Sequence, residues 1–413
     1  MTGFVELMEE RKLLAQVTHK EELIQHLAEK PRTAYVGFDP TADSLHVGSL
    51  LPLMALRRWQ QCGHRVIALV GGGTAMVGDP TGKTEMRQMM TEEVIESRIG
   101  SIKTQLSQLI DMDSPEKGMI VNNGDWLKGI EYIPFLREYG SQFSVNRMLT
   151  AECFKSRLEK GLSFLEFNYM ILQSFDFLHL FNEHGCSLQM GGDDQWSNML
   201  GGIDLIRRKT SNQAYCLTVP LLVNSQGKKM GKTEEGAIWL NRELTPPYDL
   251  FQYFRNIEDD MVEKCLYYFT DVPVDEVARL GALQGKDINE AKIKLAYEVT
   301  KLLHGEEDAA KASESAKQLF GASDASGNAP EYYVSREAFE GEDQLGILNI
   351  LQITGIAPSK AEARRWIQQG GLSIDGEKVE DINGRVALSL LQRQDGVLIK
   401  RGKKHYYRLR IQD

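Results

Sequence analysis

Two short polar stretches of this chain carry residues suited to binding a nucleotide and acting on its phosphates. The first, His46-Val-Gly-Ser49, follows a β-rich run that stops at Asp39-Pro40, and it opens a long apolar-periodic segment. A helix beginning there would turn free N–H groups and the positive end of its dipole towards a phosphate. Gly48 has no side chain, so a flat ring can lie directly on its backbone. The alternative is an ordinary strand-to-helix turn with a chance histidine.

The second stretch, about 180 residues later, is a polar, glycine-rich loop between Asn224 and Gly236 that carries Lys228, Lys229 and Lys232. Lysines in a mobile loop beside a nucleotide suit negative charge that develops only in a transition state. Considered alone, such a loop is more often simply a solvated surface segment.

Acidic residues follow two further predicted strands. The apolar run from Arg65 to Val70 ends in a glycine-rich loop that holds Asp79, and Gly191-Gly-Asp-Asp-Gln195 follows the run from Ser187 to Met190. Ligands of open α/β sheets bind at the carboxyl ends of strands. N-capping explains one aspartate at a helix start, whereas the paired glycines favour a closely approaching ligand, such as a ribose.

Other nucleotide motifs are absent. Gly82-Lys-Thr84 resembles the end of a P-loop, but Val77 stands where that motif requires glycine. The dinucleotide-binding fingerprint fails at Met76 for the same reason. A P-loop ATPase is therefore excluded.

A polar stripe lies in an otherwise apolar helix, predicted from the capping box at Ser163 to Glu166 as far as Gly185. Tyr169, Gln173 and Asp176 are spaced i, i+4 and i+7, so they share one face. Buried polar groups without partners cost about 1–3 kcal/mol each. These three side chains either satisfy one another and the backbone or line a polar pocket, and their common face favours the pocket.

The elements that position these residues alternate between strand and helix. This alternation predicts an α/β fold with a Rossmann-like, doubly wound parallel sheet. We expect residues 1–30 to be helical and the whole catalytic domain to span 1–243. An all-helical domain follows over 244–320, with helices near 247–255, 259–270, 274–283, 288–304 and 307–319. A linker over 321–344 then leads to a small α+β domain at 345–413.

Composition limits the classes of protein and partner. The 413 residues are 42% hydrophobic and 26% charged, typical of a soluble globular protein, and no apolar run is long enough to span a bilayer. Five cysteines without a C-x-x-C pair argue against a zinc site or disulfide framework and favour the cytoplasm.

Charge is uneven along the chain. The net charge is −10, but residues 345–413 carry +5, with 12 Lys and Arg against 7 Asp and Glu. Lys360, Arg364 and Arg365 in a capped helix, and Lys403 and Lys404 beside tyrosines, suit a nucleic-acid surface. An excess of +5 is also within ordinary scatter.

Together, these motifs resemble those of a known enzyme family. His46-Val-Gly-Ser49 and Lys229-Met-Gly-Lys-Thr233 resemble the HIGH and KMSKS signatures of class I aminoacyl-tRNA synthetases. The segment from Tyr35 to His46, the Tyr169-x-x-x-Gln-x-x-Asp176 helix and Gly191-Gly-Asp-Asp-Gln195 are similar to those of bacterial tyrosyl-tRNA synthetases. Residues from about 345 resemble the S4-type RNA-binding domain of that family.

The resemblance implies a tyrosine–tRNA ligase that forms tyrosyl-adenylate from tyrosine and ATP and then charges tRNA(Tyr). It implies Mg²⁺ carried by the ATP phosphates, no metal held by the protein, no tightly bound cofactor, a homodimer and no membrane. The implied tyrosine-binding residues are Tyr35, Asp79, Tyr169, Gln173, Asp176 and Gln195. The implied ATP-binding and catalytic residues are Gly37, Asp39, Thr41, His46, Gly48, Ser49, Gly192, Asp194, Lys229, Lys232 and Thr233.

Tyr35 and Asp176 are expected to recognise the phenolic hydroxyl, since phenylalanine would leave both buried and unpaired. A tryptophanyl enzyme fits less well because an indole has no such hydroxyl. A non-catalytic RNA-binding paralogue would keep the basic tail and lose the motif residues. Ser49 replaces the second histidine of HIGH, and Gly231 and Thr233 replace the serines of KMSKS, which leaves open the phosphate contact at position 49.

Overall fold

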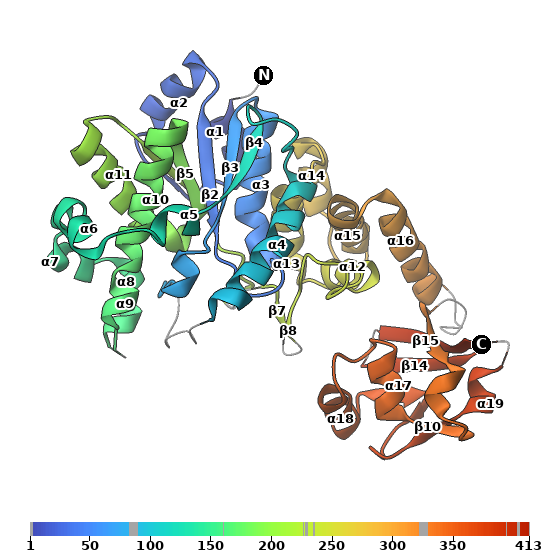
Figure 1. The fold of residues 1–413 in the computed structure, drawn as a ribbon. Coiled ribbons are helices and arrows are strands. Elements are labelled where there is room, and N and C mark those ends of the chain that lie inside the picture. Colours follow the sequence, from blue (N-terminus) through green and yellow to red (C-terminus); the bar gives the residue numbers. More distant parts are fainter. Residues whose placement is uncertain are drawn as a thin grey trace. The chain divides into compact units, whose positions relative to one another are not determined.

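The computed structural model describes residues 3–81, 90–159, 161–225, 227, 230–233, 236–321, 329–393, 395–402 and 405–412. The chain divides into two compact parts, Met1–Ala309 and Ala310–Asp413 (Figure 1). Across the described ranges, no helix is both long enough and apolar enough to cross a membrane.

A six-stranded sheet forms the centre of the first part. Its order is β1-β6-β5-β2-β3-β4, and neighbours are parallel except β1, which is antiparallel to β6. The strands are β1 (Gln16–Val17), β2 (Thr33–Phe38), β3 (Arg65–Val70), β4 (Gly118–Asn122), β5 (Cys186–Gly192) and β6 (Tyr215–Val219). Winding runs outwards from β2 to β4 and then returns to β5 on the other side of β2. The carboxyl ends of β2 and β5 therefore flank the switch point at which such sheets bind ligands.

Helices cover both faces of this sheet. Figure 1 shows α3 (Val47–Gln61) and α4 (Glu92–Leu109) on one side, and α10 (Tyr169–His184) and α11 (Trp196–Thr210) on the other. The residues of β3 are buried except for a half-buried Arg65, as expected for a strand covered on both faces. The predicted doubly wound α/β fold is confirmed. The remaining helices of this layer are α1 (Phe4–Glu10), α2 (Lys20–Glu29), α5 (Gly124–Leu127), α6 (Tyr132–Glu138), α7 (Val145–Leu149), α8 (Glu152–Leu158) and α9 (Phe164–Phe167).

Two helix predictions need correction. Residues 1–30 are not all helical, because β1 lies between α1 and α2 and is hydrogen-bonded to β6. The helix predicted from 163 to 185 is two helices, α9 and α10, which meet at Asn168. The Asn168 side-chain amide donates to the Phe164 carbonyl at 2.7 Å, an example of a polar side chain competing for helical backbone groups.

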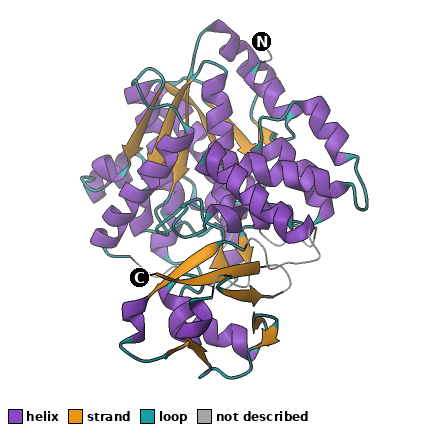
Figure 2. Cartoon of the chain, turned by 90° about the vertical axis from the view of Figure 1, so that its right-hand side faces the viewer, coloured by secondary structure: helices purple, strands orange, loops and turns teal. Residues whose placement is uncertain are grey.

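A helical segment follows the sheet and packs against α3. Its helices are α12 (Pro247–Arg255), α13 (Asp259–Phe269), α14 (Val274–Gly281) and α15 (Ile288–His304), followed by α16 (Glu306–Gly321). These bounds confirm the five predicted helices to within about two residues. Figure 2 views the molecule from the side of these helices, which lie in front of the sheet. Helices α12 to α15 thus belong to the first compact part, in which α13 packs on α3 and α15 on α4.

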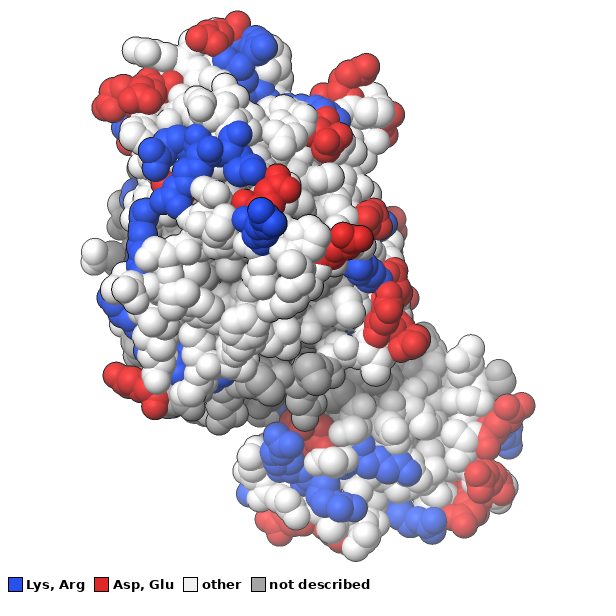
Figure 3. Space-filling model, turned by 60° about the vertical axis from the view of Figure 1, so that its left-hand side comes forward, with Lys and Arg blue, Asp and Glu red and all other residues white. Residues whose placement is uncertain are grey.

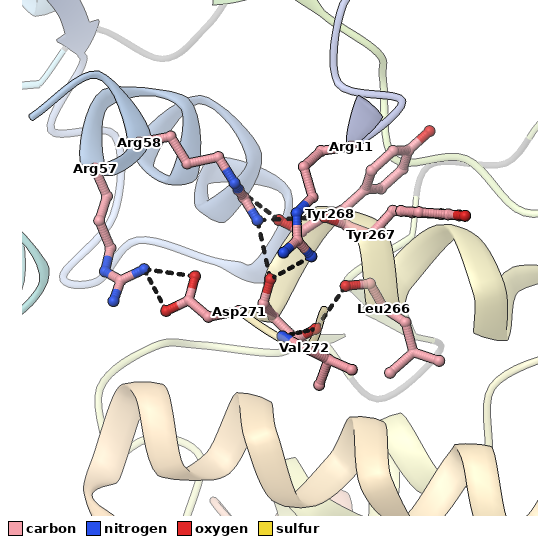
Figure 4. Close-up of polar contacts among 9 residues, drawn as sticks. Arg11, Arg57, Arg58, Leu266, Tyr267, Tyr268, Asp271 and Val272 are labelled. Atoms are coloured by element: carbon pink, nitrogen blue, oxygen red, sulfur yellow. Dashed lines mark hydrogen bonds and ion pairs between the residues drawn. The ribbon is translucent and has the colours of Figure 1, made fainter. Parts of the chain in front are cut away.

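A buried arginine of α3 joins the helical segment to the sheet layer (Figure 4). Arg58 is 2% exposed, and its guanidinium donates to the carbonyls of Tyr267, Tyr268 and Thr270 at 3.0–3.3 Å. Arg11 of the N-terminal segment donates to the same Thr270 carbonyl at 3.1 Å. These carbonyls lie at the C-terminal end of α13, where a cation satisfies unpaired acceptors and complements the helix dipole. Burial lowers the pKa of Arg58 to about 9, so the guanidinium remains charged at neutral pH.

The second part is built on a five-stranded sheet of order β12-β11-β14-β15-β9. Its strands are β9 (Glu331–Ser335), β11 (Leu372–Ile374), β12 (Glu377–Lys378), β14 (Val397–Arg401) and β15 (His405–Gln412), with a separate pair β10 (Gln344–Gly346) and β13 (Arg385–Ala387). The helices α17 (Ile347–Ile353), α18 (Lys360–Gln368) and α19 (Leu388–Leu391) complete it. Ser359 accepts from the Glu362 amide, which confirms the predicted cap of α18. The small α+β architecture predicted for the C-terminal domain is confirmed.

The predicted linker over 321–344 is wrong from residue 331 onwards. Residues 331–335 form β9, which pairs in parallel with β15 and buries Val334 in the core of the second part. Glu331 also forms an ion pair with Arg410 at 2.7 Å. The Gly-, Ser- and Asn-rich run before β9 has the composition of a linker. The sequence does not indicate the strand itself, because its partner β15 is distant in sequence.

We expect Arg58→Met to lower the free energy of unfolding by at least about 2 kcal/mol, because it removes the Arg58 donor from the buried carbonyls of Tyr267 and Tyr268 and leaves that of Thr270 with Arg11 alone. Urea unfolding followed by circular dichroism measures the loss. The matched control is Arg57→Gln on the same helix, whose ion pair with Asp271 at 2.8 Å is partly exposed and contributes about 0–1 kcal/mol. Equal losses in the two variants would contradict the structural role of Arg58.

Candidate active site

A cavity of about 410 Å³ opens at the carboxyl ends of β2 and β5. Most of the predicted site residues line it: Tyr35, Gly37, Asp39, Thr41, His46, Gly48, Ser49, Asp79, Tyr169, Gln173, Asp176, Gly192, Asp194 and Gln195. The structure therefore brings together residues from β2, α3, the loop after β3, α10 and the end of β5. Lys229, Lys403 and Lys404 lie outside the described residues, and Lys232 and Thr233 form β7 (Lys232–Thr233) with only their backbone described.

Tyr35 and Asp176 place two fully buried polar groups in the wall of the cavity. The Tyr35 hydroxyl is buried and has no hydrogen-bond partner. Asp176 is 2% exposed, and burial raises the pKa of its carboxyl to about 7. Burial, followed by the nearby charge of Asp176, raises the pKa of Tyr35 as well. This end of the cavity therefore holds a donor and an acceptor for a small polar group.

Asp176 is held in place by two residues that the sequence interpretation missed. Asn123 donates to Oδ2 of Asp176 at 2.9 Å, and the Trp126 indole donates to Oδ1 at 2.8 Å. Asn123 is itself fixed, because its Oδ1 accepts from the Gly73 amide at 2.8 Å. A signal for Asn123 was present, since it follows β4 at the same edge of the sheet as the other site residues.

A second polar group surrounds Asp39 and Asp79. Tyr169 donates to Oδ2 of Asp39 at 2.9 Å, whereas the Gln195 amide donates to Oδ2 of Asp79 at 2.8 Å. Burial raises the pKa of Asp79 to about 6 despite its hydrogen bonds from Thr81, and the charge of Asp39 raises it further. Several acids that disfavour one another's charge form a site that a cation would stabilise.

Two glutamines add unsatisfied acceptors to the cavity wall. The side-chain oxygens of Gln173 and Gln189 are buried without a hydrogen-bond partner. Gln189, on β5, was not among the predicted residues, although a glutamine within an apolar strand is itself a signal. Buried acceptors without donors are costly, so these oxygens favour a ligand that brings its own N–H or O–H groups.

The first turn of α3 is shaped by a close contact between His46 and Gly48. A Cβ on Gly48 would lie 2.7 Å from the His46 ring, so a larger residue there would have to displace the imidazole. His46 is the N-cap residue of α3, and the Ser49 amide donates to its carbonyl at 2.8 Å. His46 and Gly48 thus lie side by side where this turn lines the cavity.

The lysine-bearing segment lies directly against this turn. The Val47 amide donates to the Ile238 carbonyl at 3.0 Å, and the Ile238 amide donates to the Gly231 carbonyl at 2.8 Å. A short hairpin of β7 and β8 (Gly236–Ala237) connects these positions. The two motifs, distant in sequence, are therefore joined through backbone hydrogen bonds.

The predicted RNA-binding residues that are described lie on α18. Lys360, Arg364 and Arg365 are all exposed, and Arg365 forms an ion pair with Glu362 at 3.2 Å. On the same part of the chain, the Arg401 guanidinium lies 4.5 Å from the centre of the Trp366 ring. The second part thus offers three exposed cations on α18, whereas Trp366 itself is buried beneath the half-buried Arg401.

Comparisons with known proteins agree with this arrangement. Residues 27–321 match the family model described as tRNA synthetases class I (W and Y), and residues 330–409 match that of the tyrosine–tRNA ligase SYY-like C-terminal domain. The chain is 54% identical over 407 residues to the tyrosine–tRNA ligase of Clostridium tetani, covering 98% of both chains. It is 53% identical over 413 residues to that of Clostridium botulinum (strain Loch Maree), covering 100% of both. A C-terminally truncated mitochondrial tyrosyl-tRNA synthetase from Aspergillus nidulans is 32% identical, with a TM-score of 0.69, over 78% of this chain and 95% of that one.

The raised pKa of Asp176 predicts a pH-dependent stability. Between pH 3.8 and about pH 7, Asp176 keeps its proton in the folded protein, whereas the unfolded chain releases it. The higher proton affinity of the folded state stabilises the fold fully below about pH 4, and this stabilisation is lost as pH rises towards 7. Relative to Asp176→Asn, wild type should therefore lose up to about 4 kcal/mol from pH 4 to pH 7.

Urea unfolding of both proteins across this range measures the effect. Asp125→Asn, at an exposed position on α5, is the control, and its difference from wild type should stay within about 0.5 kcal/mol. A pH-independent difference for Asp176→Asn would contradict a buried carboxyl that holds its proton.

Proposed function

The chain belongs to the class I tyrosyl-tRNA synthetases, which are tyrosine–tRNA ligases, and we propose how its cavity carries out that reaction. The family model of the first part covers tryptophan and tyrosine enzymes alike, whereas the C-terminal model and the full-length relatives are those of tyrosine enzymes. The observation that carries the proposal is the buried, unpartnered Tyr35 hydroxyl in a cavity shared with Asp176.

The phenol of the substrate binds at this inner end. Its hydroxyl donates to Asp176 and accepts from the Tyr35 hydroxyl, which otherwise has no partner. Phenylalanine would leave both groups buried without that partner, and an indole presents no hydroxyl there. The hydrogen bonds from Asn123 and Trp126 fix the orientation of the Asp176 carboxylate.

The ammonium group of the substrate binds at the acidic end of the cavity. Asp79, Tyr169 and the free oxygen of Gln173 surround it, and its positive charge favours the ionised form of Asp79. Gln195, which already donates to Asp79, lies beside the α-carboxylate. This end therefore binds a cation and leaves the carboxylate facing the nucleotide.

ATP binds along the turn of α3 and the end of β5. His46, Gly48 and Ser49 hold its phosphates and base, Asp194 beside Gly192 takes the ribose hydroxyls, and Gly37, Asp39 and Thr41 line the remaining wall. Lys229, Lys232 and Thr233 contact the pyrophosphate. Mg²⁺ enters with the ATP phosphates.

The chemistry needs no nucleophile from the protein. A carboxylate oxygen of tyrosine attacks the α-phosphorus, the bond to the β-phosphate oxygen breaks, and pyrophosphate leaves. A ribose hydroxyl of the tRNA 3′-adenosine then attacks the tyrosyl carbonyl, and AMP leaves with the bonding electrons. The protein contributes positioning and neutralises charge as it develops on the phosphates.

The second part supplies a surface for tRNA. Lys360, Arg364 and Arg365 are exposed on α18, and Arg401 lies over Trp366. Exposed cations neutralise phosphates, so binding through them weakens as salt concentration rises. Lys403 and Lys404 extend this basic set in sequence.

The test of the proposed reaction is ATP–pyrophosphate exchange with each of the twenty amino acids, without tRNA. Exchange is expected with tyrosine alone. Tyr35→Phe should reduce the preference for tyrosine over phenylalanine by roughly tenfold in kcat/KM, because it removes one of the two hydroxyl partners. Unchanged discrimination would contradict the assignment of Tyr35, whereas no exchange with any amino acid from folded wild type would favour a non-catalytic RNA-binding protein.

We also propose that a second copy of the chain covers the face formed by α6 to α9. Large apolar side chains are exposed there: Tyr132, Ile133, Val145, Leu158, Phe164 and Leu165. Figure 3 brings this side of the first part forward and shows a broad area without charged side chains. Exposed apolar areas of this kind mark protein interfaces.

Sedimentation equilibrium is expected to give twice the chain mass for wild type and the single-chain mass for Phe164→Asp. Phe164 is 68% exposed, so the substitution should leave the fold intact. A wild-type protein that sediments as a monomer would contradict the dimer.

A further inference from the structure

Gly231, the residue before Lys232, makes its backbone contacts with residues outside the lysine-bearing segment. Gly231 adopts a φ of +80°, and a Cβ there would lie 3.3 Å from Val47 Cβ and 3.4 Å from the Gly48 amide nitrogen. Gly231 therefore packs against the first turn of α3. Its carbonyl accepts from the Ile238 amide, so the amide side of Gly231 is left to be fixed by another group.

Tyr253 of α12 provides that group. Its hydroxyl oxygen accepts from the Gly231 amide at 3.0 Å in a partly buried contact. The Tyr253 ring packs edge-on against Phe254, with ring centres 5.1 Å apart, and α12 packs along α15. The acceptor is thus carried by a rigid helix, and the donor belongs to the segment next to Lys232.

The other arm of the same segment is also tied to the helical segment. Glu258, the N-cap residue of α13, accepts from the Ser225 amide at 3.2 Å and from the Ser225 hydroxyl at 2.8 Å. This contact is exposed, so it is screened by solvent and weaker than the contact of Tyr253. Ser225 and Gly231 are therefore each hydrogen-bonded to a residue of the helical segment.

We propose that Tyr253 is a positioning residue for tyrosine activation, because its hydroxyl holds Gly231 against the turn that carries His46 and Gly48. The inference rests on the proposed role of the lysine segment in binding the phosphates of ATP. Tyr253 contacts no substrate. It acts through the backbone of Gly231, whose position determines where the next residue, Lys232, begins β7.

The test is Tyr253→Phe, which keeps the ring and its packing and removes only the oxygen. We expect kcat for tyrosine-dependent ATP–pyrophosphate exchange to fall about tenfold, since the segment loses the acceptor that fixes its place in the transition state. KM for tyrosine should stay within about twofold, because the tyrosine pocket is built from β2, the loop after β3, α10 and the end of β5, and Gly231 belongs to none of them. The urea midpoint should remain at the wild-type value.

Tyr267→Phe on α13 is the matched control, because it removes a hydroxyl from the same helical segment away from Gly231. It should leave kcat and KM unchanged. A Tyr253→Phe enzyme with wild-type kcat would overturn the proposal, and so would equal losses in both variants or a fall in kcat accompanied by a lower urea midpoint. Wild type that shows no exchange with tyrosine would instead overturn the proposed function, so the two failures are distinguishable.

Discussion

The parallel pairing of β2 with β5 is the constraint on which the site depends. It joins two strands separated by about 150 residues, and their carboxyl ends supply Tyr35 and Asp39 on one side and Gly192 and Asp194 on the other. The chain reaches β5 only after winding outwards to β4 and back, which leaves a gap between the connections at this point of the sheet. The cavity is therefore a product of the topology, and side chains only determine what it accepts.

Burial and neighbouring charges then determine the protonation of the acids in the empty cavity. Asp39, Asp79 and Asp176 all lie in one enclosure, and burial raises the pKa values of Asp79 and Asp176. Hydrogen bonds from Asn123 and Trp126 to Asp176, and from Gln195 to Asp79, reduce the free-energy cost of burying these carboxylates in the empty site. In the proposed reaction, the ammonium group of tyrosine would offset the remaining cost, because a positive charge stabilises ionised carboxylates.

The sequence was sufficient for the parts of this structure that depend on local signals. Alternating elements predicted the doubly wound sheet, and the i, i+4, i+7 spacing on α10 predicted that Tyr169, Gln173 and Asp176 face one cavity. The roles of Asn123 and Trp126 were not predicted, because they depend on contact with Asp176, some fifty residues away. Strand β9 was not predicted for the same reason, because it pairs with the sequence-distant β15 and follows a run with the composition of a linker. The roles of the lysines and of the cavity residues in catalysis stay predictions.

The parallel pairing of β9 with β15 also determines how the chain can be dissected. The strand that follows the 322–328 stretch is hydrogen-bonded to β15, so residues 331–335 and 405–412 form one structural unit. An isolated fragment that starts at 345 would expose the edge of β15 over residues 408–412 and the core side chains packed against Val334, and such open edges associate with other chains. A fragment of the second part that is meant to fold alone should therefore begin ahead of residue 329.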